Sequence, residues 1–326
     1  MERKVAARIQ IRLGPNRVGP GGIFQTAADT LKLIMKEGLT PDKADKFLFN
    51  LAPFVVMMVA MLLLAPIAFA KNFQIWDINI GVLYISAISS LSVIGILMAG
   101  WASNNKYALL GSIRSIAQII SYEIPAALAI LSVVMLYQTL NLQEMCIQQG
   151  VLSKQSLYFF GFWDVTKIGG IFAWTIFQAP HLLIAFVIYF IASLAECNRT
   201  PFDLPEAENE LNFGYHQEYS SMKLGFYLFA EYINMIMSSA IMASMYFGGY
   251  DLPFFDESTV SPNIAALIGI GTLLIKIVLF VFLFMWIRWT IPRFRYDQLM
   301  NLGWKKMIPL ALLNMLITGA LILSKL

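Results

Sequence analysis

Long apolar segments joined by shorter polar ones make up most of the chain. A helical segment of about 20 apolar residues crosses the roughly 30 Å hydrocarbon core of a bilayer. Because lipid offers the backbone no hydrogen-bond partners, such a segment must fold as a helix. Seven segments have this character, at approximately 47–70, 81–100, 122–140, 170–192, 225–247, 263–287 and 307–324. We therefore predict an all-α, polytopic membrane helical bundle in which residues 1–326 form a single integral membrane domain.

The first 46 residues carry a different pattern. The stretch RLGPNRVGPGG at 12–22 is rich in Gly and Pro, which favour turns and loops. From Phe24 to Glu37 the apolar residues fall on one helical face and the charged residues elsewhere, as in an amphipathic helix. This helix is too short to cross a bilayer. We expect residues 1–46 to form a loop whose helix lies in the membrane interface.

The composition supports a membrane protein. Hydrophobic residues make up 58% of the chain and charged residues only 13%, whereas about a quarter of the residues of a soluble domain are charged. The N-terminal sequence MERKVAARIQIR is basic and lacks the apolar core of a cleavable signal. The two cysteines, Cys146 and Cys197, indicate neither a disulfide framework nor a metal site.

Lys and Arg are distributed unevenly among the predicted loops. Of these 23 residues, 18 fall in the alternate loops 1–46, 101–121, 193–224 and 288–306. The opposite loops and the C-terminus hold four, and Lys276 lies inside a predicted span. Loops rich in positive charge remain on the cytoplasmic side, or on the matrix side in an organelle. We therefore place these four loops on that side.

The loop 193–224 is the most acidic part of the chain. Its six carboxylates oppose only Arg199 and Lys223, and belong to Glu196, Asp203, Glu206, Glu208, Glu210 and Glu218. The stretch from Asp203 to Glu206 has the form of a capping box, which predicts a helix ending near Gly214. One interpretation is a solvated helix start, where acids complement the helix dipole. Because six acids lie beside two spans, we favour a functional role.

Four ionisable residues fall in or near the predicted spans. Glu231 lies inside the span 225–247 and Lys276 inside 263–287, while Glu123 and Glu196 lie at span ends. Ionisable groups inside a membrane are costly and usually functional, so each is a candidate. For Glu123 and Glu196 an interfacial position explains the sequence equally well. Lys276 also fits a packing role in which its ammonium group binds a helix carbonyl.

The remaining basic residues and the missing motifs restrict the chemistry. Basic clusters near both ends suit membrane anchors, counter-ions for the acids or a docking surface, and spacing does not separate these roles. The sequence contains no dinucleotide or phosphate-binding glycine motif. No Cys and His cluster has metal-ligand spacing, since the only histidines are His181 and His216. We expect no metal site and no redox centre in this chain, so a partner must supply any electron transfer.

Four blocks of the sequence resemble one known family. They are ERKVAARIQIRLGPNRVGPGG with AADTLKLIMKE; GWASNNKYALLGSIRSIAQIISYE; AECNRTPFDLPEAENELNFGYHQEYSSMK with AEY at 230–232; and PRFRYDQLMNLGWKKMIPL. Together they cover nearly the whole chain. The chain resembles the quinone-site membrane subunit of respiratory complex I (NADH-quinone oxidoreductase), which is called the H subunit in bacteria and subunit 1 in mitochondria.

This resemblance assigns roles to individual residues. It implies a tunnel for a lipid quinone lined by Arg12, Asp29, Arg199, Asp203 and Arg288. It also implies a row of proton-coupling carboxylates formed by Glu123, Glu196, Glu206, Glu208, Glu210, Glu218 and Glu231. Closely spaced carboxylates titrate as a coupled set, so a charge change at one end alters proton affinity along the row.

The resemblance also implies a function and its partners. We expect a subunit of a proton-translocating NADH:quinone oxidoreductase whose substrate is ubiquinone or menaquinone. Iron–sulfur clusters and FMN would belong only to partner subunits. The expected partners are the peripheral-arm iron–sulfur and quinone-site subunits, the antiporter-like and small membrane subunits, and lipid quinone, with no nucleic acid. We favour a bacterial inner membrane over the mitochondrial inner membrane.

The sequence departs from the family in one large respect. The family has eight spans, and the first would precede Glu2, where the printed sequence begins with Met1. We expect the natural start to lie further upstream. Cys197 and Thr200 also replace the commoner Thr and Ala. Two alternatives remain, namely the related membrane subunit of an energy-converting hydrogenase and a stand-alone ion transporter, although we find no paired repeats typical of transporters.

Overall fold

The structure is a computed structural model and consists almost entirely of helices. It describes residues 1–71, 73–150, 158–159, 163–164, 170–203, 214–253 and 261–325. The long helices are α3 (Lys46–Leu62), α4 (Gly81–Ala102), α5 (Lys106–Tyr137), α8 (Pro180–Glu196), α10 (Ser221–Tyr246), α11 (Pro262–Thr290) and α13 (Ile308–Lys325). Each lies at one of the seven predicted spans.

The shorter elements lie between or before these helices. The short helices are α1 (Glu2–Ile9), α2 (Gln25–Met35), α6 (Leu142–Gln149), α7 (Thr175–Gln178) and α12 (Tyr296–Asn301). Tighter or wider helical turns are η1 (Pro20–Gly22), η2 (Gly170–Ala173), η3 (Gly214–His216) and the π-helical η5 (Leu302–Met307). Two small antiparallel hairpins consist of β1 (Ala68–Ala70) with β2 (Phe73–Gln74), and β3 (Tyr158–Phe159) with β4 (Trp163–Asp164).

The predicted class is confirmed. Among the described residues, five helical stretches are long and apolar enough to cross a membrane, namely Gly81–Ala102, Lys106–Tyr137, Ser221–Tyr246, Asn263–Thr290 and Tyr296–Ser324. The two remaining predicted spans contain the shorter apolar helices α3 and α8. The protein is therefore an all-α, polytopic membrane helical bundle. The amphipathic helix predicted from Phe24 to Glu37 is α2, which has no buried residue.

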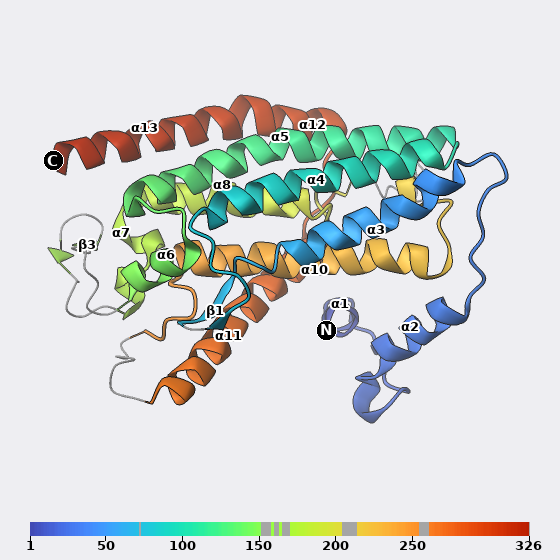
Figure 1. The fold of residues 1–326 in the computed structure, drawn as a ribbon, viewed down its shortest axis with the longest axis horizontal. Coiled ribbons are helices and arrows are strands. Elements are labelled where there is room, and N and C mark those ends of the chain that lie inside the picture. The colour runs from blue at the N-terminus through green and yellow to red at the C-terminus, as the bar shows by residue number, and fades with distance from the viewer. Residues whose placement is uncertain are drawn as a thin grey trace.

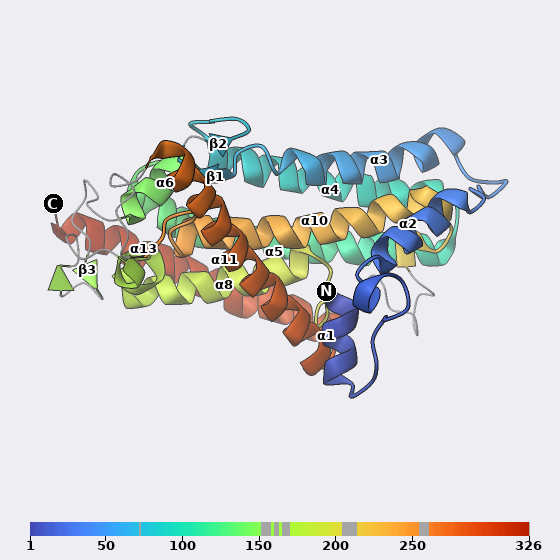
Figure 2. The same ribbon diagram turned by 90° about the horizontal axis from the view of Figure 1, so that it is seen from below.

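The long helices lie side by side in an elongated bundle (Figure 1). Helices α3, α4, α5, α8 and α10 run along a common direction, and α11 crosses them at an angle (Figures 1 and 2). The C-terminus, α6 and the β3 hairpin lie at one end, while α2 lies toward the other (Figure 1). Helix α5 packs against α4, α8 and α13, and α10 packs against α3 and α11.

Small residues allow the closest helix contacts. A Cβ atom on Gly100 of α4 would come within 2.1 Å of Ser112 Oγ on α5. A Cβ atom on Gly95 of α4 would come within 2.5 Å of a Val56 methyl group on α3. Glycine permits such approaches in membrane bundles because the backbones themselves can meet.

One boundary prediction was wrong. The segment 101–121 was expected to be a loop, but α5 begins at Lys106 and continues to Tyr137. Asn105 caps this helix, with its side chain accepting a hydrogen bond from the Tyr107 backbone N–H. Glu123 therefore lies in the middle of a helix rather than at its end. The helix predicted after Asp203 falls outside the described residues.

Candidate functional site

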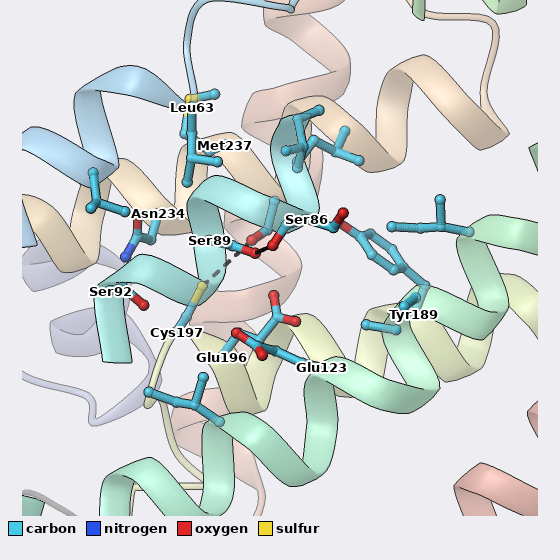
Figure 3. A pocket seen from close by; sticks show the side chains of 18 of the residues that line it. Leu63, Ser86, Ser89, Ser92, Glu123, Tyr189, Glu196, Cys197, Asn234 and Met237 are labelled. Atoms are coloured by element: carbon cyan, nitrogen blue, oxygen red, sulfur yellow. Dashed lines mark hydrogen bonds between the residues drawn. The ribbon is translucent and has the colours of Figure 1, made fainter. Parts of the chain in front are cut away.

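Two carboxylates face a common cavity inside the bundle. Glu123 of α5 and Glu196, the last residue of α8, line a cavity of about 290 Å³, which we name the acid cavity (Figure 3). The other polar groups of its wall belong to Ser86, Ser89, Ser92, Tyr189, Cys197, Asn234 and Ser238. Since a water takes up about 30 Å³ in the liquid, several waters fit here. Because interacting carboxylates titrate together, we name Glu123 and Glu196, which line one cavity, the acid pair.

One carboxylate oxygen of Glu123 is buried beside this cavity. Its Oε1 atom is buried and has no hydrogen-bond partner among the residues that the structure describes. A buried polar atom of this kind is usually satisfied by water or by a proton. The cavity beside it offers room for that water. Glu123 thus lies in the middle of α5 with one buried oxygen beside this cavity.

A second cavity connects the acid pair to Glu231. It has a volume of about 20 Å³ and is lined by Glu196, Glu231 and Asn234, among others; we name it the linking cavity. Asn234 and Cys197 line both cavities. A polar cavity above roughly 10–15 Å³ holds one water. The linking cavity thus has room for one water between residues that include Glu196 and Glu231.

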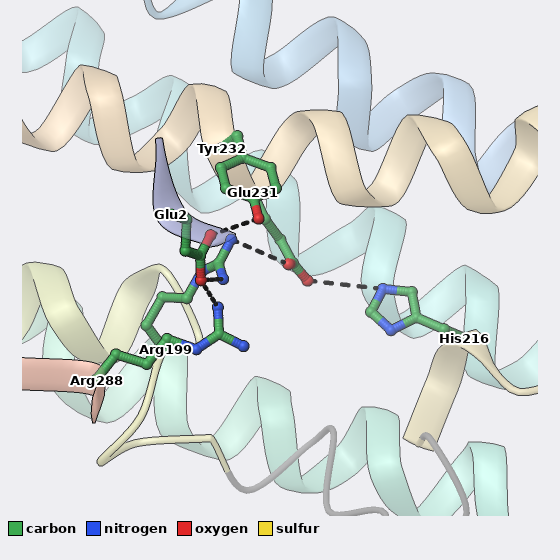
Figure 4. Close-up of polar contacts among 6 residues, drawn as sticks. All are labelled: Glu2, Arg199, His216, Glu231, Tyr232 and Arg288. Carbon is green, nitrogen blue, oxygen red and sulfur yellow. Dashed lines mark hydrogen bonds and ion pairs between the residues drawn. The ribbon is translucent and has the colours of Figure 1, made fainter. Parts of the chain in front are cut away.

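Beyond Glu231 lies a compact group of charged side chains. We name Glu2, Arg199, Glu231, Tyr232 and Arg288 the ion cluster (Figure 4). One Oε1 atom of Glu2 accepts from both guanidinium groups, at 2.5 Å from Arg288 Nη1 and 3.4 Å from Arg199 Nη1. Tyr232 donates its hydroxyl proton to the other Glu2 oxygen. These contacts gather α1, α10, α11 and the turn after α8 around one point.

Glu231 lies between a guanidinium and an imidazole (Figure 4). Its Oε2 atom is 3.9 Å from Arg199 Nη2, and its Oε1 atom is 3.8 Å from His216 Nε2. The side chain of His216 is only 1% exposed. Burial lowers the pKa of His216 to about 3, so this imidazole is neutral at physiological pH. Of the two neighbours of Glu231, Arg199 is therefore charged and His216 is not.

A buried glutamine holds Arg199 in place. Gln118 of α5 donates from Nε2 to the carbonyls of Ala195, at 2.8 Å, and Phe202, at 2.7 Å. These two carbonyls flank the turn that carries Arg199. The Arg199 guanidinium carbon also lies 4.6 Å from the centre of the Tyr232 ring, a cation–π contact. The arginine is thus positioned from both α5 and α10.

A larger cavity opens from the ion cluster toward the amphipathic helix. It has a volume of about 600 Å³ and is lined by Glu2, Arg3, Asp29 and Tyr232, and we name it the interface cavity. Its apolar wall consists of Met1, Pro15, Ile23, Leu33, Leu228, Phe229, Met235, Ile236, Val281 and Met285. An apolar cavity with a few polar groups is typical of a site for a small organic ligand.

Asp29 carries its charge at the mouth of this cavity. Its Oδ2 atom lies 2.5 Å from Arg3 Nη1, and Gln25 donates to Oδ1 at 3.0 Å. Burial acts to raise the pKa of Asp29, but these hydrogen bonds and the charges of Arg3 and Lys32 lower it below its ordinary value of 3.8. The carboxylate is ionised at physiological pH.

The structure brings together some predicted site residues and separates others. Glu123, Glu196, Glu231, Arg199 and Arg288 line one connected series of cavities and contacts. Of the other predicted residues, Arg12 is exposed and its side chain bonds to Gln10, Glu218 accepts from Asn105 at 2.7 Å, and Asp203 is half-buried. Glu206, Glu208 and Glu210 lie outside the described residues.

Some site residues were not predicted. Glu2, Tyr232 and Asn234 belong to the site, and His216 contacts Glu231. Glu2 and Tyr232 stand in the ERK and AEY motifs quoted above, which was the available signal. Asn234 follows Glu231 by three residues, so both fall on one face of α10. His216 carried no signal beyond being one of two histidines.

Lys276 has the packing role that was one of its two interpretations. Its Nζ atom donates to the carbonyls of Phe247, Gly249 and Asp251, at 2.7, 2.7 and 3.0 Å. It also lies 5.1 Å from the centre of the Trp174 ring. These contacts join α11 to the turn that follows α10, at the end of α10 away from the ion cluster. In the parts of the chain that the structure describes, no group of three or more His, Cys, Asp or Glu residues could hold a metal ion.

Taken together, the helical bundle and its long apolar helices define an integral membrane protein. Comparison of the sequence with known protein families identifies one family. The family model described as NADH dehydrogenase matches residues 1–319, and the chain belongs to this family.

Relatives from several bacteria are similar over almost the full length. The chain is 50% identical to H subunit 1 of the NADH-quinone oxidoreductase of Cytophaga hutchinsonii over 331 residues, covering 99% of this chain and 90% of that protein. It is 45% identical to the H subunit of the NADH-quinone oxidoreductase of Flavobacterium johnsoniae, covering 99% and 89%. It is 44% identical to NADH-quinone oxidoreductase subunit 8 of Rhodothermus marinus, covering 97% and 89%.

Proposed function

We propose that the chain is a membrane subunit of a bacterial NADH-quinone oxidoreductase and couples quinone reduction to proton movement. The observation that carries this proposal is the connected series of sites. The interface cavity meets the ion cluster at Glu2 and Tyr232, and the linking cavity joins Glu231 to the acid cavity. Family membership supports the enzyme class.

The interface cavity suits a quinone. Its apolar wall accommodates an isoprenoid chain, and its polar groups at Asp29, Arg3 and Tyr232 suit a carbonyl-bearing headgroup. Helix α2, which is amphipathic and lies beside this cavity, belongs at the membrane surface where a lipid substrate enters. The cavity also reaches Glu2, which contacts both arginines of the ion cluster.

The carboxylate row suits the coupling step. Reduction of a quinone to a quinol takes up two protons and changes the charge near the ion cluster. Glu231, Glu196 and Glu123 are linked by water-sized space, so the charge change alters how protons distribute among them. The chain then moves protons through its own side chains, while iron–sulfur clusters and FMN belong to partner subunits.

The same proposal defines partners and location. The peripheral-arm subunits that carry the redox centres would dock near α2 and the loop that contains Arg199. Antiporter-like and small membrane subunits would continue the row beyond the acid cavity. The bacterial inner membrane is the proposed location, consistent with the bacterial sources of the relatives.

The test uses the assembled complex with the substitution Glu231→Gln, which preserves shape and removes the carboxylate. We expect NADH:quinone turnover and proton pumping to fall by about tenfold or more, as for a lost proton-transfer group. NADH oxidation by ferricyanide should be unchanged because electrons leave before the quinone site. Glu144→Gln is the matched control, since Glu144 is an exposed acid of α6.

Three outcomes would decide the matter. Loss of quinone activity in Glu231→Gln alone supports the proposal. Normal quinone turnover and pumping in both variants would refute it. Hydrogen evolution by the purified wild-type assembly without quinone reductase activity would refute it in favour of a hydrogenase.

A further inference from the structure

His216 contacts a buried acid and lies two residues before a half-buried one. Its imidazole occupies the turn η3, and Nε2 is 3.8 Å from Glu231 Oε1 (Figure 4). Two residues later Glu218 is half-buried and accepts a hydrogen bond from Asn105, at the cap of α5. Two residues span at most about 7 Å of chain. The turn thus carries an imidazole that contacts an interior carboxylate, and a half-buried carboxylate follows two residues later.

The surroundings of His216 are mostly aromatic. Its ring centre lies 3.8 Å from that of Tyr215 and 5.0 Å from that of Tyr227 on α10. Helix α5 meets the same turn through Gly111, whose Cβ position is 3.0 Å from Gly214 Cα. The ionisable groups that face His216 include Glu231 and these two tyrosines.

Such an environment keeps the imidazole neutral. Because burial holds the pKa of His216 near 3, the imidazole is not protonated at physiological pH and adds no positive charge beside Arg199. A neutral imidazole still has one nitrogen that donates and one that accepts. It therefore conducts a proton without remaining charged.

We propose that His216 is a proton-relay residue that delivers protons from the aqueous side of η3, at Glu218, to Glu231. This inference rests on the proposed function, because the protons it delivers enter the carboxylate row. In each transfer a proton binds one ring nitrogen while the proton on the other nitrogen leaves for the Glu231 carboxylate. The imidazole ends neutral in the other tautomer, Glu231 becomes neutral, and one proton is taken from water.

The experiment measures solvent isotope effects on the assembled complex. His216→Asn keeps a polar side chain but cannot relay a proton, so we expect NADH:quinone turnover to fall by about tenfold. The ratio of turnover in H2O to that in D2O should rise at least twofold, because proton delivery becomes rate-limiting. Oxidation of NADH by ferricyanide should not change.

The chain offers a matched control. His181, the only other histidine, begins α8 and is 9% exposed. His181→Asn should leave turnover and the isotope ratio at their wild-type values. Should His216→Asn fail to assemble, His216→Gln provides the same comparison with a longer amide.

The outcomes separate this inference from the proposed function. A wild-type isotope ratio in the assembled His216 variant refutes the relay, whether turnover falls or not, because a structural defect alone does not make proton delivery limiting. If Glu231→Gln loses pumping while His216→Asn is normal, only the relay fails. If neither variant loses activity, the proposed function fails as well.

Discussion

At the scale of single residues, the ion cluster balances buried charges of both signs. Glu2 and Glu231 are each 13% exposed, and Arg199 is 8% exposed. Removing one partner from such a group leaves the others uncompensated, which costs more than the pairs themselves contribute. The arginines therefore matter to stability as well as to function.

Arg199→Gln should lower the stability of the assembled complex by about 3 kcal/mol, the order of magnitude for a broken buried ion pair. The measurement is the midpoint temperature of loss of NADH:quinone activity. Arg12→Gln is the control, because the Arg12 side chain is exposed and bonds to Gln10. Equal midpoints for the two variants would contradict the buried role of Arg199.

His216 gives a prediction for pH. The folded protein holds the pKa of this residue near 3, whereas an exposed histidine has a value of 6.5. The unfolded chain therefore binds more protons between these values, so stability is complete above pH 6.5 and decreases as the pH falls below it. His216→Asn should weaken the decline of the inactivation temperature from pH 7 to pH 5. An unchanged decline would show that other groups cause it.

At the scale of elements, contact between backbones sets how α4 and α5 pack. Gly100 has no room for a methyl group because Ser112 of α5 occupies the space. Gly271 of α11 has nothing within 4 Å of its Cβ position. The two glycines thus differ in surroundings although both lie in apolar helices.

Gly100→Ala should destabilise the protein by about 1–3 kcal/mol, as overpacking does. Gly271→Ala should be neutral or stabilise by up to about 1 kcal/mol, since alanine favours helix. Thermal inactivation of the complex in native membranes compares them. A larger loss for Gly271→Ala would contradict the packing described for these helices.

The positions of the long helices could largely be predicted from the sequence, and the exceptions have physical causes. Apolar runs located the seven long helices because lipid leaves the backbone no alternative. The start of α5 was missed because its first turns carry Lys106 and Arg114, which lower the local apolar content. Hydropathy detects burial in lipid, whereas the polar turns of α5 pack against protein.

The site was less predictable than the fold. The motifs indicated Glu231, Arg199 and Arg288, yet the contact between Glu2 and Arg288 joins residues 286 positions apart. Such a contact depends on the whole packing, so no local pattern encodes it. Arg12 was expected in the tunnel; its side chain is exposed and bonds to Gln10, and its role stays a prediction.

At the scale of the whole molecule, three cavities and one ion cluster form a series from the interface to the interior. The interface cavity touches Tyr232, the linking cavity touches Glu231 and Glu196, and the acid cavity holds Glu196 with Glu123. If protons move along this series as proposed, its carboxylates titrate as a coupled set, so we expect their contributions to be non-additive.

The acid pair provides the test of that coupling. Glu123→Gln and Glu196→Gln should each lower proton pumping by about tenfold, and the double variant should lose little more than the worse single one. Pumping is measured by quenching of a pH-sensitive dye in liposomes that contain the complex. Independent, multiplicative losses would contradict a shared cavity.

Lys276 also constrains how α10 and α11, the two helices that carry Glu231, Tyr232 and Arg288, lie against each other. Its three hydrogen bonds fasten α11 to the turn after α10, where Gly248 and Gly249 adopt positive φ angles of 71° and 54°. Glu231 and Tyr232 lie on one of these helices, and Arg288 lies on the other. Lys276 lies near the middle of α11, so these bonds join the middle of that helix to the C-terminal end of α10. Separating the helices there would leave a half-buried ammonium group without its three acceptors, so this contact fixes the point at which α11 crosses α10.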